Sequence, residues 1–135
     1  MTSDEILALL RGGFERWDES GVTIEQSGYR SCRLRLAFHD RQLRAGGTIN
    51  GPTMFMLADT ALYVAVLSSV GPKALAVTTN MSINFLRKPA PKDMIAECRL
   101  LKLGKRLAVG EVFIYSDGEE AEAVAHATGA YAVPA

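Results

Sequence analysis

The chain has little cysteine, little histidine and no surplus of either charge, and each shortage excludes a class of protein. Its 135 residues include two cysteines, Cys32 and Cys98, which are too few for a disulfide framework or a cysteine-rich zinc site. Fifteen basic residues balance fifteen acidic ones, so nothing favours binding to nucleic acid. The histidines, His39 and His126, have no metal-ligand spacing with other side chains. The sequence therefore predicts a reducing, cytoplasmic location and neither a metal nor a redox cofactor.

One long apolar run requires a membrane helix to be considered. Residues 54–70 are nearly all apolar and approach the length of a spanning helix. Asp59 and Thr60 stand near the middle of this run, and no basic flank would set its orientation. Residues 1–5 are acidic, whereas a secretory signal begins with basic residues. We therefore expect a soluble protein that has no membrane partner and uses this run as a core helix.

Two helices are predicted from their terminal signals. Residues 2–5 form a capping box in front of a short apolar helical run that Gly12-Gly13 interrupts. Pro52 occupies a first helical position, where its missing N–H costs nothing, and Gly71-Pro72 ends the apolar run. The helix over 52–70 is apolar on every face, so most of its surface must be enclosed by the rest of the chain.

Strand signals fill most of the remaining sequence. They occupy 22–26, 32–38, 75–85, 94–103 and 107–116, and a sixth segment, 119–133, follows the turn at Asp117-Gly118. No linker or repeat divides residues 1–135, which indicates a single domain. Helices on one face of a mostly antiparallel sheet make an α+β fold. We expect a hotdog arrangement, in which the sheet curls around one long central helix.

Three segments resemble the PaaI-type hotdog acyl-CoA thioesterases. They are Gly47-Thr48-Ile49-Asn50-Gly51-Pro52, Leu57-Ala58-Asp59-Thr60-Ala61 and Val77-Thr78-Thr79-Asn80-Met81-Ser82-Ile83-Asn84-Phe85-Leu86-Arg87, and the likeness extends from about Gly46 to the C-terminus. The resemblance implies a single thioesterase-like domain that hydrolyses an acyl-CoA to a free acid and coenzyme A. Coenzyme A enters as part of the substrate, and no separate cofactor is implied.

The resemblance also implies roles for individual residues. Asp59 matches the acid of the central helix, and Gly51 matches the glycine whose N–H polarises the thioester carbonyl. Asn50 stands where relatives usually carry a histidine, and its side-chain amide could donate to the same carbonyl. Thr78 matches a residue that assists the acid in some relatives. Arg44 replaces an asparagine that helps to hold the substrate carbonyl or water, so we assign Arg44 to substrate binding.

The chemistry of two of these residues can also be judged from the sequence itself. Placing the charged carboxylate of Asp59 inside an apolar helix costs free energy. The residue therefore needs either a catalytic role or a polar partner. It could accept a proton from water, attack the thioester as a nucleophile, or serve only a structural role, hydrogen-bonded to Thr60 or to a neighbouring strand. Gly51 lies at a helix N-terminus, where free N–H groups and the helix dipole favour a developing oxyanion. Its alternative role is plain helix capping.

The spacing of these two residues predicts an obligate homodimer. Eight residues of helix separate Gly51 from Asp59, which is about 12 Å. A base and an oxyanion donor that act on one carbonyl must lie much closer, since each hydrogen-bonded link is about 3 Å. Two antiparallel helices across a two-fold axis can bring Gly51 of one chain to Asp59 of the other. The sequence leaves open whether two such dimers pair into a homotetramer.

Basic residues at two turns are candidates for contact with the phosphates of coenzyme A. Arg87-Lys88 follows a strand, and Lys105-Arg106 lies in a predicted hairpin. Both pairs offer charge-assisted hydrogen bonds to phosphate oxygens. Solvated surface charge is the alternative.

Two other functions remain open. Arg44, Asn50 and Pro52 replace residues that members of the family usually carry. These replacements would also suit a hotdog protein that binds acyl-CoA without hydrolysing it. A hotdog dehydratase or hydratase is less favoured, because that chemistry needs a catalytic histidine beside the acid and Asn50 occupies the obvious place.

Overall fold

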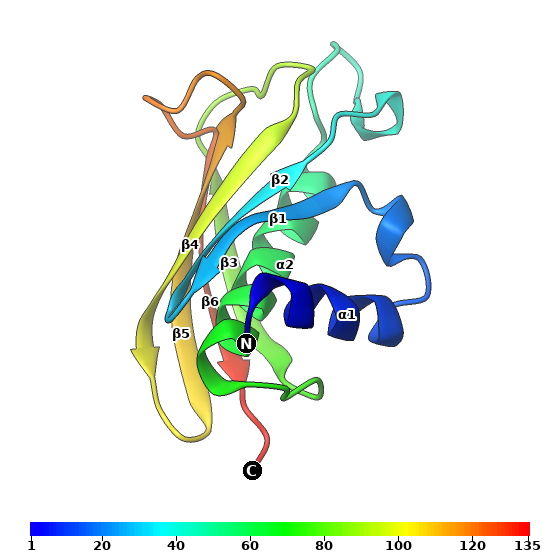
Figure 1. Ribbon diagram of the computed structural model, residues 1–135. Helices are drawn as coiled ribbons and strands as arrows, with labels where there is room; N and C mark the ends of the chain where they lie inside the picture. Colours follow the sequence, from blue (N-terminus) through cyan, green and yellow to red (C-terminus); the bar gives the residue numbers. More distant parts are fainter.

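A computed structural model describes all 135 residues and shows a six-stranded antiparallel sheet curled around one long helix (Figure 1). The sheet has the strand order β1-β2-β4-β5-β6-β3. The elements are α1 (Ser3–Gly13), β1 (Val22–Gly28), β2 (Ser31–Leu36), α2 (Gly51–Val70), β3 (Val77–Phe85), β4 (Met94–Leu103), β5 (Leu107–Ser116) and β6 (Ala125–Ala132), with short 3-10 helices at Trp17–Glu19 and Asp40–Gln42. This arrangement confirms the predicted α+β hotdog fold.

The predicted signals lie at the starts of both helices and at the end of α2, whereas α1 continues through Gly12 and Gly13 instead of being interrupted there. Thr2 caps α1, because its hydroxyl accepts the N–H of Glu5 while the Glu5 carboxylate accepts the N–H of Thr2. Asn50 caps α2, and Gly71 ends it with a φ of 89°, a value that L-residues with a side chain rarely adopt. Pro52 is the second residue of α2, one position later than predicted, because the helix begins at Gly51.

The last strand is shorter than the sequence predicted. The expectation of a strand over 119–133 is wrong at its start, because β6 begins at Ala125 and the residues after the Asp117-Gly118 turn form a loop. Three glutamates of this loop bind basic side chains elsewhere: Glu119 binds Lys92, Glu120 binds Arg33 and Glu122 binds Arg87. These ion pairs connect the loop to β2 and to the residues that follow β3.

Three smaller boundaries also differ from the prediction. Ser27-Gly28 belongs to β1, and the hairpin turn falls at Tyr29-Arg30, where Arg30 adopts a φ of 65°. Strand β2 ends at Leu36, and β3 starts at Val77. Beyond β2 the N–H of Phe38 donates to Asp93, so a side chain replaces the next strand partner.

The apolar character of α2 is explained by its position in the core. The helix is long and apolar enough to cross a membrane. Ten of its twenty residues, however, are buried inside the protein. Leu62 faces two glycines that lie directly opposite each other, Gly110 on β5 and Gly129 on β6. A Cβ at either glycine would lie 2.8 Å from a methyl group of Leu62. Side chains are thus absent where α2 comes closest to the sheet.

Replacing Gly129 with alanine should destabilise the fold. The new methyl group would meet Leu62 at 2.8 Å and the backbone oxygen of Asn80 at 3.2 Å, and overpacking of this kind costs about 1–3 kcal/mol. Urea unfolding of Gly129→Ala should show that loss. Gly12→Ala is the matched control: a Cβ there meets nothing within 4 Å, and in a helix alanine stabilises by up to about 1 kcal/mol. Equal stability of the two variants would contradict this packing.

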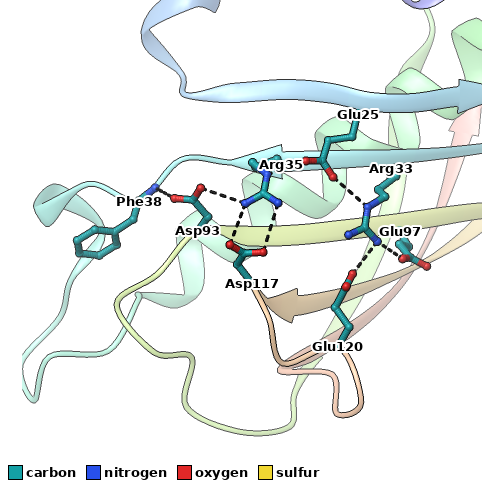
Figure 2. Close-up of polar contacts among 8 residues, drawn as sticks. All are labelled: Glu25, Arg33, Arg35, Phe38, Asp93, Glu97, Asp117 and Glu120. Atoms are coloured by element: carbon teal, nitrogen blue, oxygen red, sulfur yellow. Dashed lines mark hydrogen bonds and ion pairs between the residues drawn. The ribbon is translucent and has the colours of Figure 1, made fainter.

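The outer face of the sheet carries a network of ion pairs centred on two arginines of β2 (Figure 2). Arg33 binds Glu25, Glu97 and Glu120, and Arg35 binds Glu25, Asp93 and Asp117. The hydrogen bond from Arg35 lowers the pKa of both Glu25 and Asp117. A carboxyl whose pKa is lowered by folding stabilises the fold at neutral pH and loses that effect as the pH falls through the lowered value. The network therefore joins β1, β2, β4 and the 117–124 loop near neutral pH.

The two cysteines lie side by side in the core as free thiols. Cys32 on β2 pairs in register with Cys98 on β4. The hydrogen bond with Cys98, together with burial, raises the pKa of Cys32 well above its usual value. Both residues are therefore buried packing groups.

Candidate active site

The carboxylate of Asp59 is held by one residue from each of two neighbouring strands. Asp59 lies in the third turn of α2 and is half-buried. Its Oδ1 atom accepts the hydroxyl of Thr78 at 2.6 Å and the hydroxyl of Tyr131 at 2.7 Å. Thr78 on β3 and Tyr131 on β6 are register partners, so their side chains meet at one point of the sheet. The predicted pairing of Thr78 with Asp59 is thus present in the structure.

A mostly apolar cavity of about 960 Å³ lies against this carboxylate. Helix α2 contributes Tyr63 to its wall, and the N-terminal segment contributes Phe14 and Trp17. Trp17 is buried, while Phe14 is half exposed and contacts Tyr63 edge to face at 6.0 Å between ring centres. The cavity can therefore accept an apolar group next to a charged oxygen.

The N-terminus of α2 forms a second, separate recess of about 320 Å³ that Gly51 lines. Asn50 accepts the N–H and the hydroxyl of Thr53 through its Oδ1 atom, at 2.8 and 2.6 Å, which leaves its amide nitrogen without a protein partner. The N–H of Gly51 also donates to no protein atom. Two donors thus remain free at a positive helix end.

One chain does not bring Gly51 and Asp59 together. The two residues line different cavities and are about 12 Å apart along a straight helix. A single chain therefore keeps Gly51 and Asp59 apart.

The predicted phosphate-binding cations fall into two groups at opposite ends of the sheet (Figure 1). Arg44, Arg87 and Lys88 line the recess beside Gly51. Arg87 is already engaged, since it binds Glu122 at 2.9 Å and the backbone oxygen of Ala123 at 3.0 Å. Lys105-Arg106 lies in the β4–β5 turn at the far end and does not join this group in one chain.

A comparison with protein families decides the affiliation. The profile described as "Thioesterase superfamily" matches residues 46–123, which include Asn50, Gly51, Asp59 and Thr78. The chain belongs to the thioesterase superfamily. The predicted resemblance to thioesterases of the PaaI type is confirmed at this level, and the matched region covers more than half of the chain.

Individual relatives of this superfamily member support the same affiliation. A solved structure from Silicibacter sp. TM1040, titled a "putative thioesterase", is 40% identical with a TM-score of 0.89, and the match covers 100% of this chain and 93% of the other. A Halobacterium salinarum protein named "Putative esterase" is 30% identical over 76% of this chain and 71% of its own length.

Two more distant structures share the fold. The PaaI protein of E. coli is 20% identical with a TM-score of 0.82, covering 100% of this chain and 97% of the other. A Streptococcus mutans protein solved with bound acetyl CoA is 20% identical with a TM-score of 0.73, covering 84% of this chain and 88% of the other.

Sequence reasoning missed the contact of Tyr131 with the acid. The sequence showed Tyr131 only as a residue near the end of the last strand, 72 positions after Asp59. Burial, together with the hydrogen bond to Asp59, raises the pKa of Tyr131 well above its usual value, so its hydroxyl keeps its proton and remains a donor. The only available signal was a tyrosine in a strand that packs on α2, and this does not reveal register.

Proposed function

We propose that this superfamily member hydrolyses an acyl-CoA thioester to a free acid and coenzyme A. The observation that carries the proposal is the Asp59 carboxylate, whose Oδ1 atom is held by two hydroxyl donors beside a mostly apolar cavity. In this assignment the acyl group occupies the cavity, which places its carbonyl next to the acid.

Hydrolysis requires that the carbon–sulfur bond breaks and that the elements of water are added across it. Asp59 can accept the proton of the attacking water, or it can attack the carbonyl to form an anhydride that water then opens. In both routes negative charge develops on the carbonyl oxygen. The free N–H of Gly51, with the amide nitrogen of Asn50 beside it, is suited to stabilise that charge.

The second half of each site is proposed to come from a partner subunit. Strand β3 forms one edge of the sheet, and most of its residues are exposed. Exposed apolar side chains gather on and beside it; among them are Leu75, Val77, Phe85 and Leu86, each more than half exposed. An exposed edge strand with apolar side chains is a ready surface for pairing with a second chain. Two-fold pairing would bring Gly51 of one chain toward Asp59 of the other. The proposal holds equally for a dimer and for a tetramer built from two such dimers.

Coenzyme A recognition is proposed for the basic rim of the Gly51 recess. Arg44 and Lys88 are exposed there and can bind phosphate oxygens, with Arg87 beside them. A fold relative was solved with acetyl CoA, which supports this ligand class. We also propose that the protein acts in the cytoplasm, where acyl-CoA is present. The role of Lys105-Arg106 depends on a partner subunit bringing that turn to the recess.

The test is thiol release by the purified protein from a panel of short, medium and aromatic acyl-CoAs. We expect release that increases in proportion to protein concentration, with one group of acyl chains preferred. Tight acyl-CoA binding without thiol release would instead identify a binding protein, the alternative that Arg44, Asn50 and Pro52 suggested. That outcome would overturn the hydrolytic proposal.

A dehydratase or hydratase is disfavoured by the positions of the two histidines. His39 is exposed in a loop. His126 faces the outer side of β6, where it lies beside Phe113 and 3.4 Å from Glu111. Neither histidine lies with Asp59 on the wall of its cavity.

A further inference from the structure

We infer that Tyr131 is a positioning residue for the catalytic acid: its hydroxyl fixes the Oδ1 atom of Asp59, so that Oδ2 is the oxygen that acts on the substrate. This inference rests on the proposed function and adds a residue outside the matched family region, which ends at residue 123.

The two carboxylate oxygens of Asp59 have different surroundings. Oδ1 accepts both hydroxyls, from Thr78 at 2.6 Å and from Tyr131 at 2.7 Å, whereas Oδ2 has no hydrogen-bond partner in the protein. The Tyr131 hydroxyl also lies 3.1 Å from the main-chain oxygen of Asp59. One phenol thus contacts the side chain and the backbone of the same residue. Rotating the carboxylate away from this orientation would break two hydrogen bonds at once.

Tyr131 is itself held firmly. It is 4% exposed, and β6 lies between β3 and β5, with Thr78 opposite it on one side and Ala108 on the other. Its ring packs against Tyr63 with the ring centres 6.0 Å apart. The hydroxyl is therefore positioned by a strand inside the sheet, which fixes a donor more precisely than a loop would.

The hydrogen bond from Tyr131 also suits the proposed role of Asp59. A hydrogen bond donated to a carboxylate favours its charged form. The charged form is the one needed by a base or a nucleophile. The titratable groups that line the surrounding cavity are Glu15, Arg16, Tyr63 and Tyr131, and of these Tyr131 alone bonds Asp59.

The test compares Tyr131→Phe with wild type across the pH range. Phenylalanine keeps the ring and its packing but removes the donor. We expect kcat at its plateau to fall about 10-fold while KM changes less than about 2-fold, because the lost bond is to the acid and not to the substrate. The acidic limb of the kcat profile should move to higher pH, since the hydrogen bond from Tyr131 no longer favours the charged form. A purely structural tyrosine would not move that limb.

Tyr63→Phe is the matched control. It removes a hydroxyl from the same cavity, but that hydroxyl donates to the backbone oxygen of Ala74 at 2.8 Å and not to Asp59. We expect the acidic limb to stay in place in this variant, whatever happens to KM. A limb that moves equally in both variants would overturn the specific role of Tyr131.

A second measurement does not depend on turnover. Carbon-13 NMR of the Asp59 carboxyl at neutral pH should show a changed chemical shift in Tyr131→Phe, because Oδ1 loses a donor. If that variant does not fold, 3-fluorotyrosine in the wild-type chain replaces it, because the more acidic phenol is a stronger donor and should shift the same resonance in the opposite direction. An unmoved resonance, or an unchanged kcat in folded Tyr131→Phe, overturns the inference. Wild type that releases no thiol overturns the proposed hydrolysis instead, so the two failures are distinguishable.

Discussion

Asp59→Asn should lower the rate of thiol release at least about 100-fold, which is the order expected when a general base is removed. Asparagine has the same shape, and its carbonyl oxygen can still accept the hydroxyls of Thr78 and Tyr131 that Oδ1 of Asp59 accepts now. The variant should therefore fold and bind acyl-CoA while losing the charged oxygen. The measurement is kcat on the best substrate of the acyl-CoA panel, together with a melting temperature for each protein.

Asp40→Asn is the control for this experiment. Asp40 is an exposed carboxylate in a 3-10 helix, and its side chain has no hydrogen bond or ion pair. We expect this variant to keep the wild-type rate. Unchanged turnover in Asp59→Asn would reject the residue as the catalyst, and the proposed mechanism would be lost with it.

Mixing two inactive variants should restore activity if each site uses residues from two subunits. Gly51→Pro removes the N–H that is proposed to stabilise the oxyanion, at a cost of at least about 100-fold. Proline is favoured in the first helical turn, and Asn50 already has the extended backbone that a following proline requires. In a heterodimer of Gly51→Pro with Asp59→Asn, one composite site is doubly altered and the other is intact. Random pairing at equal amounts then gives about a quarter of wild-type activity.

The experiment joins separately tagged chains by co-expression and measures thiol release by the heterodimer and by each parent. Gly51→Ala is the matched control, because it adds a Cβ at the same place, 3.2 Å from the ring of Phe85, and keeps the N–H. It should lose far less activity than Gly51→Pro. A mixture as inactive as its parents would exclude the shared site and would require Gly51 and Asp59 to act within one chain or not together.

Helix signals allowed much of this fold to be predicted, because each acts over a few residues. Pro52 and Gly71 mark the ends of α2 through local backbone preferences. The apolar faces between them require an enclosing sheet. Asp59 was recognisable because a lone carboxylate in such a helix needs an explanation. Local chemistry and burial thus determine the framework and its central acid.

The features that the sequence did not reveal depend on register and on ion pairs between distant residues. The contact of Tyr131 with Asp59 depends on the alignment of β6 with β3, which includes a bulge between Thr78 and Asn80. No local pattern encodes that alignment. In the same way, the glutamates in the loop before β6 pair with basic residues that are distant in sequence, such as Glu120 with Arg33, and no local pattern predicts those partners.

The paired glycines beneath Leu62 have a consequence for the acid as well as for packing. Leu62 follows Asp59 by three residues on α2, and Gly129 precedes Tyr131 by two residues on the same face of β6. Because these two positions lack side chains, Leu62 can pack directly on the sheet. This packing helps to set the distance between the Asp59 carboxylate and the two hydroxyls that it accepts. A methyl group inserted at either glycine would press on Leu62 and so on the helix that carries Asp59. Substitution of these glycines should therefore change the enzymatic rate as well as the stability of the fold.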